Sequence, residues 1–187
     1  MEEKYLYGLD LSLSCTGVTI YDLEEERFVY IGHIGTDHIT KKKANKHLYL
    51  NALKLEEIYN NLLILKAKYP PRAIAIERGF SRFNTATQSI FRVHGLVNFI
   101  FRDIPQEYYP PKEVKAQIIK GTASKLQLQG VINNHYPNIE FNNEDESDSF
   151  AVALTYLMKN GIIEVFPERI EPKTKKKKSW LYLVGMI

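Results

Sequence analysis

Four carboxylates lie within five positions of this chain, immediately before an apolar segment. They are Glu144, Asp145, Glu146 and Asp148, in the stretch NEDESDSFAVAL. At ~4 Å, two like charges repel by ~1 kcal/mol in water and by roughly 4 kcal/mol near a protein surface. A cluster this dense therefore needs a compensating positive charge.

Two explanations of the acidic cluster are open. Asn142 or Asn143 can cap a helix that starts here, and the helix dipole stabilises each acid in the first turn by ~0.3–1 kcal/mol. Alternatively, a divalent cation neutralises the cluster, because Asp145 and Asp148 are three positions apart and share one face of a helix. Oxygen ligands of this kind suit Mg²⁺ or Mn²⁺. Two carboxylates do not complete a catalytic metal site, so the other ligands must come from elsewhere.

The apolar pattern predicts the elements that position these residues. Strands are expected over residues 5–13, 17–21, 27–34, 73–77 and the stretch QEYYPP. The first three form an antiparallel meander, because short polar turns such as DLEEE connect strands directly. Helices are expected over residues 46–69, 85–103, 111–121, 124–136 and 143–160. The order β-β-β-α-β-α-β-α-α-α predicts an α/β fold with a mixed sheet.

Two further acids fall where interior strands end. Asp10 lies in the first strand, in YGLDLSLSCTG, and Glu77 closes the strand AIAIE. An ionised Asp in an apolar strand is costly unless it is paired or bound to a cation. A helix crosses between the two strands, so they are expected to run parallel and to bring both carboxylates together. Simpler roles are open: Asp10 can end a strand in a turn, and Glu77 can pair with Arg78.

A metal site is predicted if the helix that begins at Asn143 packs beside these strand ends. Asp10, Glu77, Asp145 and Asp148 would then converge. Four carboxylates can hold two divalent ions ~3.5–4 Å apart, which clamp the attacking and leaving oxygens in phosphodiester hydrolysis. One ion would lower the pKa of a bound water and the other would stabilise the departing 3′ oxygen. No protein nucleophile is then needed.

Composition bounds the class of protein. The chain has 187 residues, 44% hydrophobic and 25% charged, which suits a single globular domain. Its net charge of +3 is divided between acidic and basic zones, which is compatible with nucleic-acid binding. The basic zones are Lys41–Lys43 with Lys46 and His47, then Lys112, Lys115, Lys120 and Lys125, and finally Lys173 with Lys175–Lys178. Solvated surface charge explains any one of them equally well.

Compartment and domain division follow from simple patterns. Cys15 is the only cysteine, so an intrachain disulfide is impossible and a reducing compartment is expected. There is no apolar run of ~20 residues and no signal pattern at the start MEEK, which predicts a cytoplasmic protein without a membrane contact.

Residues 1–161 are interpreted as the domain and residues 162–187 as an extension. The extension carries the lysine-rich tail (Lys173 and Lys175–Lys178).

Four stretches together carry a resemblance to a known family. They are GLDLSLSCTG (8–17), AIAIERGF (73–80), YPPKEVK with GTASKLQLQ (109–129) and DESDSFAVAL (145–154). In order and spacing over roughly residues 4 to 160, the chain resembles the RuvC family of Holliday junction resolvases, which have the RNase H-like fold. This resemblance implies a mixed five-stranded sheet flanked by helices. Two departures are visible: Leu11 and Ser12 replace a Pro-Gly pair, and Ser149 stands where alanine is usual.

The resemblance also assigns roles to residues. It implies that Asp10, Glu77, Asp145 and Asp148 bind two Mg²⁺ or Mn²⁺ ions, with Glu144 and Glu146 as electrostatic background. It places Lys115 and Lys125 near the scissile phosphate, where a lysine offsets developing charge. Phe80 would stack on an unpaired base, a contact of ~1–3 kcal/mol. Apart from the resemblance, Arg82 and Phe83 in the loop SRFNTATQ and Lys112 in the second basic zone are expected to contact DNA. As isolated residues, the lysines can be plain surface charges and Phe80 a core-edge aromatic.

The implied activity is the cutting of four-way DNA junctions by paired symmetric nicks in a bacterial or phage-infected cell, with other branched DNA as a further candidate substrate. A homodimer supplies two equivalent sites, and in this family the region of helix 85–103 makes the dimer contact. Two alternatives stay open: an RNase H acting on RNA–DNA hybrids, and a protein that binds branched DNA without cutting it. ATPases of the actin or hexokinase type need two such domains, which 187 residues cannot supply.

Overall fold

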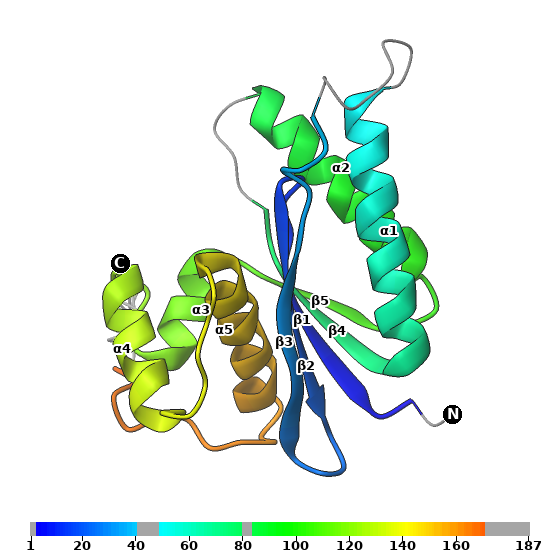
Figure 1. The fold of residues 1–187 in the computed structure, drawn as a ribbon. Coiled ribbons are helices and arrows are strands. Elements are labelled where there is room, and N and C mark those ends of the chain that lie inside the picture. Colours follow the sequence, from blue (N-terminus) through cyan, green and yellow to red (C-terminus); the bar gives the residue numbers. More distant parts are fainter. Residues whose placement is uncertain (1–2, 41–48, 80–83, 171–187) are drawn as a thin grey trace, which may run out of the picture.

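The computed structural model describes residues 3–40, 49–79 and 84–170, with the side chains of residues 84–87 excepted (Figure 1). Phe80, Arg82, Phe83 and the lysine-rich tail lie outside the described residues. Among the described helices, none is both long enough and apolar enough to cross a membrane.

A five-stranded mixed sheet forms the centre of the fold. Its strands are β1 (Tyr5–Asp10), β2 (Cys15–Asp22), β3 (Arg27–Gly35), β4 (Pro71–Glu77) and β5 (Gln106–Tyr109). The order across the sheet is β3-β2-β1-β4-β5, with β1–β2 and β2–β3 antiparallel and β1–β4 and β4–β5 parallel. This arrangement confirms the predicted RNase H-like α/β fold, including the meander followed by parallel strands.

Helices cover both faces of the sheet. They are α1 (Leu50–Lys68), α2 (Asn84–Ile100), α3 (Pro111–Ile118), α4 (Lys125–His135) and α5 (Glu144–Lys159). Helices α1 and α2 lie on one face, while α5 lies against the other with α3 and α4 outside it (Figure 1).

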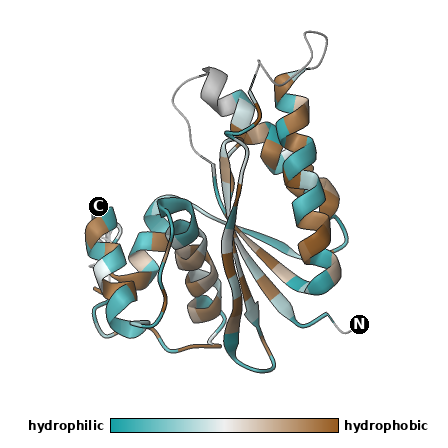
Figure 2. Ribbon diagram, viewed as in Figure 1, coloured by the Kyte–Doolittle hydropathy of each residue, from teal (hydrophilic) through white to brown (hydrophobic). Residues whose placement is uncertain are grey.

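Alternation along the strands divides the apolar residues between two cores, because successive side chains of a strand point to opposite faces. On β1, Leu6 packs in the core beneath α5, whereas Tyr7 and Leu9 pack in the core beneath α1 and α2. Phe150 of α5 and Ile58 of α1 are both fully buried, one in each core. Figure 2 shows hydrophobic residues along the strands and on the helices that cover them.

Several predicted boundaries are wrong by a few residues, and local hydrogen bonds explain why. The first strand ends at Asp10 instead of residue 13, because the Ser12 hydroxyl accepts from the Cys15 amide (3.0 Å) and turns the chain. The second helix ends at Ile100, where a turn leads to Pro105, and the third ends at Ile118. The first helix begins at residue 50, and residues 46–48 of its expected range lie outside the described chain.

Helix α5 lies unusually close to the sheet because two strand positions lack a side chain. A Cβ atom on Gly17 would lie 2.0 Å from the carbonyl oxygen of Asp145, and one on Gly8 would lie 2.5 Å from that of Ser149. The hydroxyls of Thr19 on β2 and Ser149 on α5, both fully buried, are 2.9 Å apart. These contacts fix the start of α5 over β1 and β2.

Residues 162–170 follow α5 and pack on the domain. Phe166 is 7% exposed, and its ring stacks on that of His135 with centroids 3.9 Å apart. The Ile170 amide donates to the Ile119 carbonyl at 2.6 Å, which brings the chain next to the end of α3.

Candidate active site

The strand carboxylates Asp10 and Glu77 meet at one edge of the sheet. Each is the last residue of its strand, and the parallel register pairs Leu9 with Ile76 immediately before them. The two carboxyl groups are close enough to act on each other's pKa. Burial raises the pKa of Asp10, and the negative charges of Glu77 and then Asp148 raise it further. Burial likewise raises the pKa of Glu77, with Asp148 as the next cause.

Helix α5 brings the acidic cluster to this edge. Asn143 caps the helix, because its side-chain oxygen accepts from the Glu146 amide at 2.9 Å. Asp145 and Asp148 are half-buried, and both act electrostatically on Asp10. The four carboxylates that the sequence singled out therefore occupy one neighbourhood.

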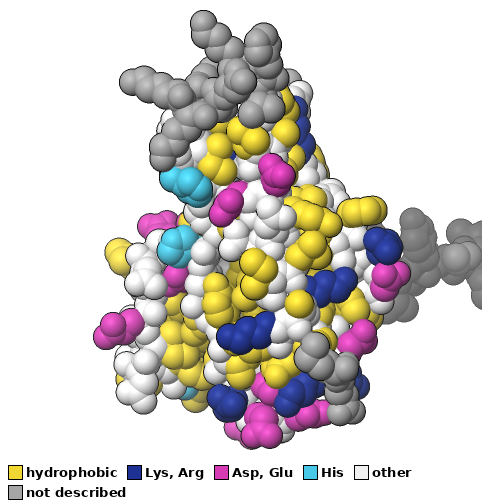
Figure 3. Space-filling view, turned by 45° about the vertical axis from the view of Figure 1, so that its right-hand side comes forward, with side chains coloured by type: hydrophobic (Ala, Val, Ile, Leu, Met, Phe, Trp, Pro, Cys, Tyr) yellow, Lys and Arg dark blue, Asp and Glu magenta, His cyan; other side chains and the backbone are white. Residues whose placement is uncertain are grey.

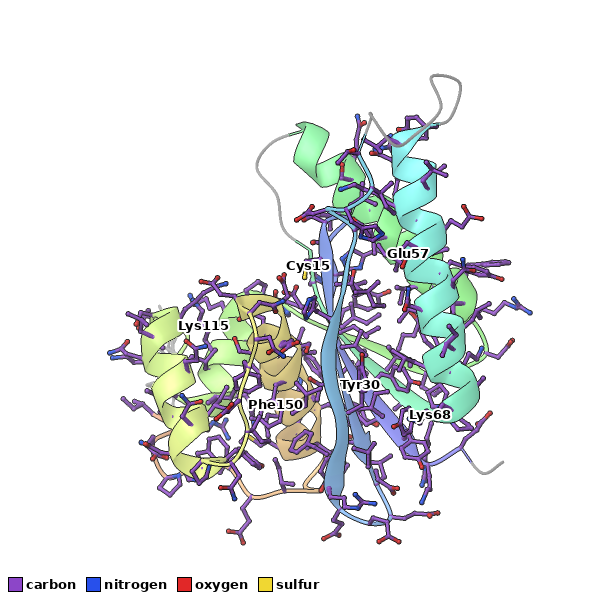
Figure 4. All side chains as sticks on the ribbon, viewed as in Figure 1. Cys15, Tyr30, Glu57, Lys68, Lys115 and Phe150 are labelled. Atoms are coloured by element: carbon purple, nitrogen blue, oxygen red, sulfur yellow. The ribbon has the colours of Figure 1, made fainter. Side chains whose placement is uncertain are left out.

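Two lysines from α3 and α4 complete the surroundings. The Lys125 ammonium donates to Asp148 at 2.8 Å and to Glu144 at 2.9 Å. Partial burial opposes its charge, but these two bonds raise the pKa of Lys125 above its ordinary value. Glu77, Lys115, Lys125 and Asp148 all line one pocket of about 240 Å³. Lys115 is labelled in Figure 4, on the lobe formed by α3, α4 and α5.

Lys112 is placed differently from the other two lysines. It is exposed and does not line that pocket. Instead, its side chain lies against the turn between α3 and α4, where a Cβ atom on Gly121 would lie 3.0 Å from its Cγ. The structure thus separates Lys112 from Lys115 and Lys125.

Glu146 has a different environment from its acidic neighbours. It is 1% exposed, and its carboxylate accepts from His33 Nδ1 at 2.7 Å and from the Asn142 amide at 2.7 Å. Burial alone would raise the pKa of Glu146, but these hydrogen bonds lower it below its ordinary value. The sequence does contain a signal for this burial: Glu146 is three and four positions before Ser149 and Phe150, on the helix face that meets the sheet.

Cys15 also reaches the site, a role that sequence reasoning missed. Its side chain lies at the start of β2 beside the beginning of α5 (Figure 4). Burial, together with the nearby Asp145 carboxylate, raises the pKa of Cys15 to about 12. The thiol is therefore protonated at neutral pH.

The chemistry of the donor set fits divalent metal ions. Within the described residues, no group of three or more His, Cys, Asp or Glu side chains could hold a metal ion as the side chains stand. Of the four carboxylates, Asp148 is engaged by Lys125, and Asp145 lies beside the Cys15 thiol. The remaining pair, Asp10 and Glu77, is half-buried with raised pKa values, and a bound cation would relieve the repulsion among these carboxylates. Oxygen-only donors of this type suit Mg²⁺ or Mn²⁺.

Helix α2 presents both core and surface aromatic residues. Val93 is fully buried, as is Phe101 just beyond the helix, so both belong to the core. Phe91 and Phe99 are instead 60% and 61% exposed. Ile64 of α1 is also 65% exposed, and Figure 3 shows hydrophobic side chains gathered on the side of the molecule that carries α1.

Comparisons with known proteins agree with one another. The family described as "Crossover junction endodeoxyribonuclease RuvC" matches residues 6–156. A protein of that name from Prochlorococcus marinus subsp. pastoris is 28% identical over 160 residues, covering 83% of this chain and 98% of the relative. One from Hydrogenovibrio crunogenus is 27% identical over 179 residues, covering 92% and 97%.

Solved structures show the same fold. T. thermophilus RuvC in complex with a Holliday junction substrate has a TM-score of 0.69 at 18% identity, covering 86% of this chain and 96% of that one. The structure of Thermus thermophilus RuvC gives a TM-score of 0.66 at 20% identity, covering 84% and 96%.

Proposed function

We propose, because this chain belongs to the RuvC family of crossover junction endodeoxyribonucleases, that it is a metal-dependent endonuclease that resolves four-way DNA junctions by paired symmetric nicks. The observation that carries the proposal is the meeting of Asp10, Glu77 and Asp148 beside Lys115 and Lys125. This is the combination that phosphodiester hydrolysis needs: carboxylates for metal ions and cations for the phosphate.

In this proposal, Asp10, Glu77, Asp145 and Asp148 hold two Mg²⁺ or Mn²⁺ ions. When bound, such ions activate a water and stabilise the leaving 3′ oxygen. Asp10 and Glu77 are the rigid part of the ligand set, because both end strands of the central sheet. Asp148 would turn toward the ions once released from Lys125, and Asp145 would join them from its place beside Cys15.

Lys125 has a defined task in the proposed reaction. Without DNA its ammonium neutralises Asp148 and Glu144. A scissile phosphate entering the pocket would bring negative charge to the same place, and Lys125 and Lys115 can then bind it and offset the charge that develops in the transition state. The ammonium thus serves as a counterion before the substrate arrives and as a phosphate ligand afterwards.

The substrate and the assembly follow from symmetry. A junction with two-fold symmetry is cut usefully by two equivalent sites, so we propose a homodimer. The exposed Phe91 and Phe99 make the outer face of α2 suitable for that contact. Phe80, Arg82 and Lys112 are proposed as additional DNA contacts, and the cytoplasm as the compartment.

A cleavage assay with four labelled substrates tests the proposal. The purified protein is mixed with a four-way junction, a Y-fork, a linear duplex and an RNA–DNA hybrid, each with Mg²⁺ and with EDTA. We expect metal-dependent paired nicks in the junction, weaker cutting of the fork and none of the duplex. Cleavage of only the RNA strand of the hybrid would indicate an RNase H instead. Junction binding without any cleavage in Mg²⁺ or Mn²⁺ would indicate a non-cleaving binding protein.

A further inference from the structure

One buried carboxylate beside the proposed ligands has no part in the reaction described above. Glu146 follows Asp145 directly and precedes Asp148 by two positions, yet it is 1% exposed and does not line the pocket. Its partner His33 lies on β3, 113 positions earlier in the chain. The bond therefore joins an edge strand of the sheet to the first turn of the ligand-bearing helix.

Both oxygens of the buried Glu146 carboxylate accept hydrogen bonds. One oxygen accepts from His33 Nδ1 at 2.7 Å and from the Asn142 side chain at 3.2 Å, and the other accepts from the Asn142 amide at 2.7 Å. A buried carboxylate is tolerated only when such bonds replace its hydration. Glu146 therefore holds one defined position instead of sampling several.

The register of the sheet explains why this bond controls the start of α5. His33 is paired directly with Gly17 on the neighbouring strand β2. Gly17 is the position on which the helix start rests, because a Cβ atom there would lie 2.0 Å from the Asp145 carbonyl oxygen. The paired residues Gly17 and His33 therefore have complementary roles. Gly17 leaves space for the start of α5, and His33 binds Glu146 in its first turn.

A helix fixed at two points on one side cannot rotate about its axis. The second point is the buried contact of Thr19 with Ser149, 2.9 Å long, which lies on β2 one turn further along α5. Residues 145 and 148 belong to the same turn of the helix, so a rotation would change the positions of both proposed ligands relative to Asp10.

We propose that Glu146, held by His33, is a positioning residue that sets the directions of Asp145 and Asp148 toward the metal ions. The inference rests on the proposed function for its ligand assignment. It differs from a purely structural role in one measurable respect: loss of the bond should weaken metal binding even in protein that stays fully folded.

The test measures Mn²⁺ binding by titration calorimetry in the absence of DNA. Glu146→Gln keeps the shape of the side chain, and His33→Ala removes the partner from a partly exposed position, so the second variant tests the inference if the first does not fold. Glu140→Gln is the matched control, because it removes the same charge from an exposed position nearby. Circular dichroism and urea unfolding verify that each variant is folded at the temperature of the titration.

We expect Mn²⁺ affinity to fall about 10-fold in Glu146→Gln and several-fold in His33→Ala, in the range typical of residues that orient metal ligands. The double variant should be no worse than the more affected single variant, because both changes act on the same contact between residues 33 and 146. Affinities within twofold of the parent protein in both folded variants would overturn the inference. So would an equal loss in Glu140→Gln.

The same titration separates this inference from the proposed function. If the parent protein binds Mn²⁺ and the variants bind it more weakly, the positioning role stands even when junctions are not the substrate. If the parent protein binds no Mn²⁺, the ligand assignment and the positioning role both fail.

Discussion

Replacing Asp10 by asparagine should abolish cleavage and at the same time make the metal-free protein more stable. The Asp10 side chain is half-buried at the end of β1, and this desolvation together with the charges of Glu77, Asp148 and Asp145 raises the pKa of Asp10 to about 8. An acid whose pKa is raised in the folded state keeps its proton there longer than in the unfolded chain. The free energy of unfolding therefore falls as pH rises above about 4, and it levels off above about 8.

The magnitude follows from the distance between the two pKa values. The pKa of Asp10 rises from its ordinary value of 3.8 to about 8, which is a shift of about four units. Each unit corresponds to about 1.4 kcal/mol. The shifted pKa of Asp10 therefore lowers the free energy of unfolding by at most roughly 6 kcal/mol at high pH. Glu77 shares the same repulsion, and asparagine keeps a polar amide in the site. We therefore expect Asp10→Asn to gain about 1–3 kcal/mol at pH 8.

Urea unfolding in EDTA at pH 5 and pH 8 measures the effect. The parent protein should lose stability between these pH values, and Asp10→Asn should lose much less. Addition of Mg²⁺ at pH 8 should stabilise the parent protein by mass action and leave the variant nearly unchanged. Asp103→Asn is the control, because its side chain is 75% exposed. The reasoning is refuted if Asp10→Asn is less stable than the parent protein at pH 8 in EDTA.

Three further predictions concern the cations and the close helix–sheet packing. Lys125→Met should slow single-turnover cleavage at least ~10-fold with junction binding nearly intact. Lys112→Met, outside the pocket, should mainly weaken junction binding. Equal losses of cleavage rate in the two variants would contradict the assignment of Lys125 to the scissile phosphate. Replacing the lysine-rich tail by glutamines should lower the slope of log affinity against log salt by ~0.9 for each phosphate that is no longer neutralised, and an unchanged slope would mean that the tail does not touch DNA. Gly17→Ala should cost about 1–3 kcal/mol in urea unfolding because its Cβ would overlap α5, while Gly95→Ala, which meets open space on a helix, should cost nothing; equal effects would contradict the packing argument.

The elements of the site were predictable where local patterns determine them. Asp10 and Glu77 each close an apolar run, and the intervening helix implies parallel strands, so their proximity follows from connectivity. The start of α5 follows from the cap Asn143 before an acidic turn, and its end from Gly161, whose φ of 67° favours glycine.

Contacts between distant segments were not predictable in the same way. The bond between His33 and Glu146 depends on the register of β3, which no local pattern specifies. The double ion pair of Lys125 depends on how the turn at Gly121 folds α4 back toward α5. The ends of α2 and α3 were overestimated for a related reason: apolar spacing continues through the turns that end them.

The hydroxyl pair of Thr19 and Ser149 beneath α5 limits the order in which these two residues can be substituted during evolution. The Thr19 hydroxyl bonds to that of Ser149, whereas Ser149 also donates to the Glu146 carbonyl at 2.9 Å. Replacing the serine first would strand a fully buried threonine hydroxyl, at a cost of ~1–3 kcal/mol. Replacing the threonine first, by valine, leaves the serine satisfied. An alanine at position 149 is therefore tolerated only after Thr19 has been replaced by an apolar residue.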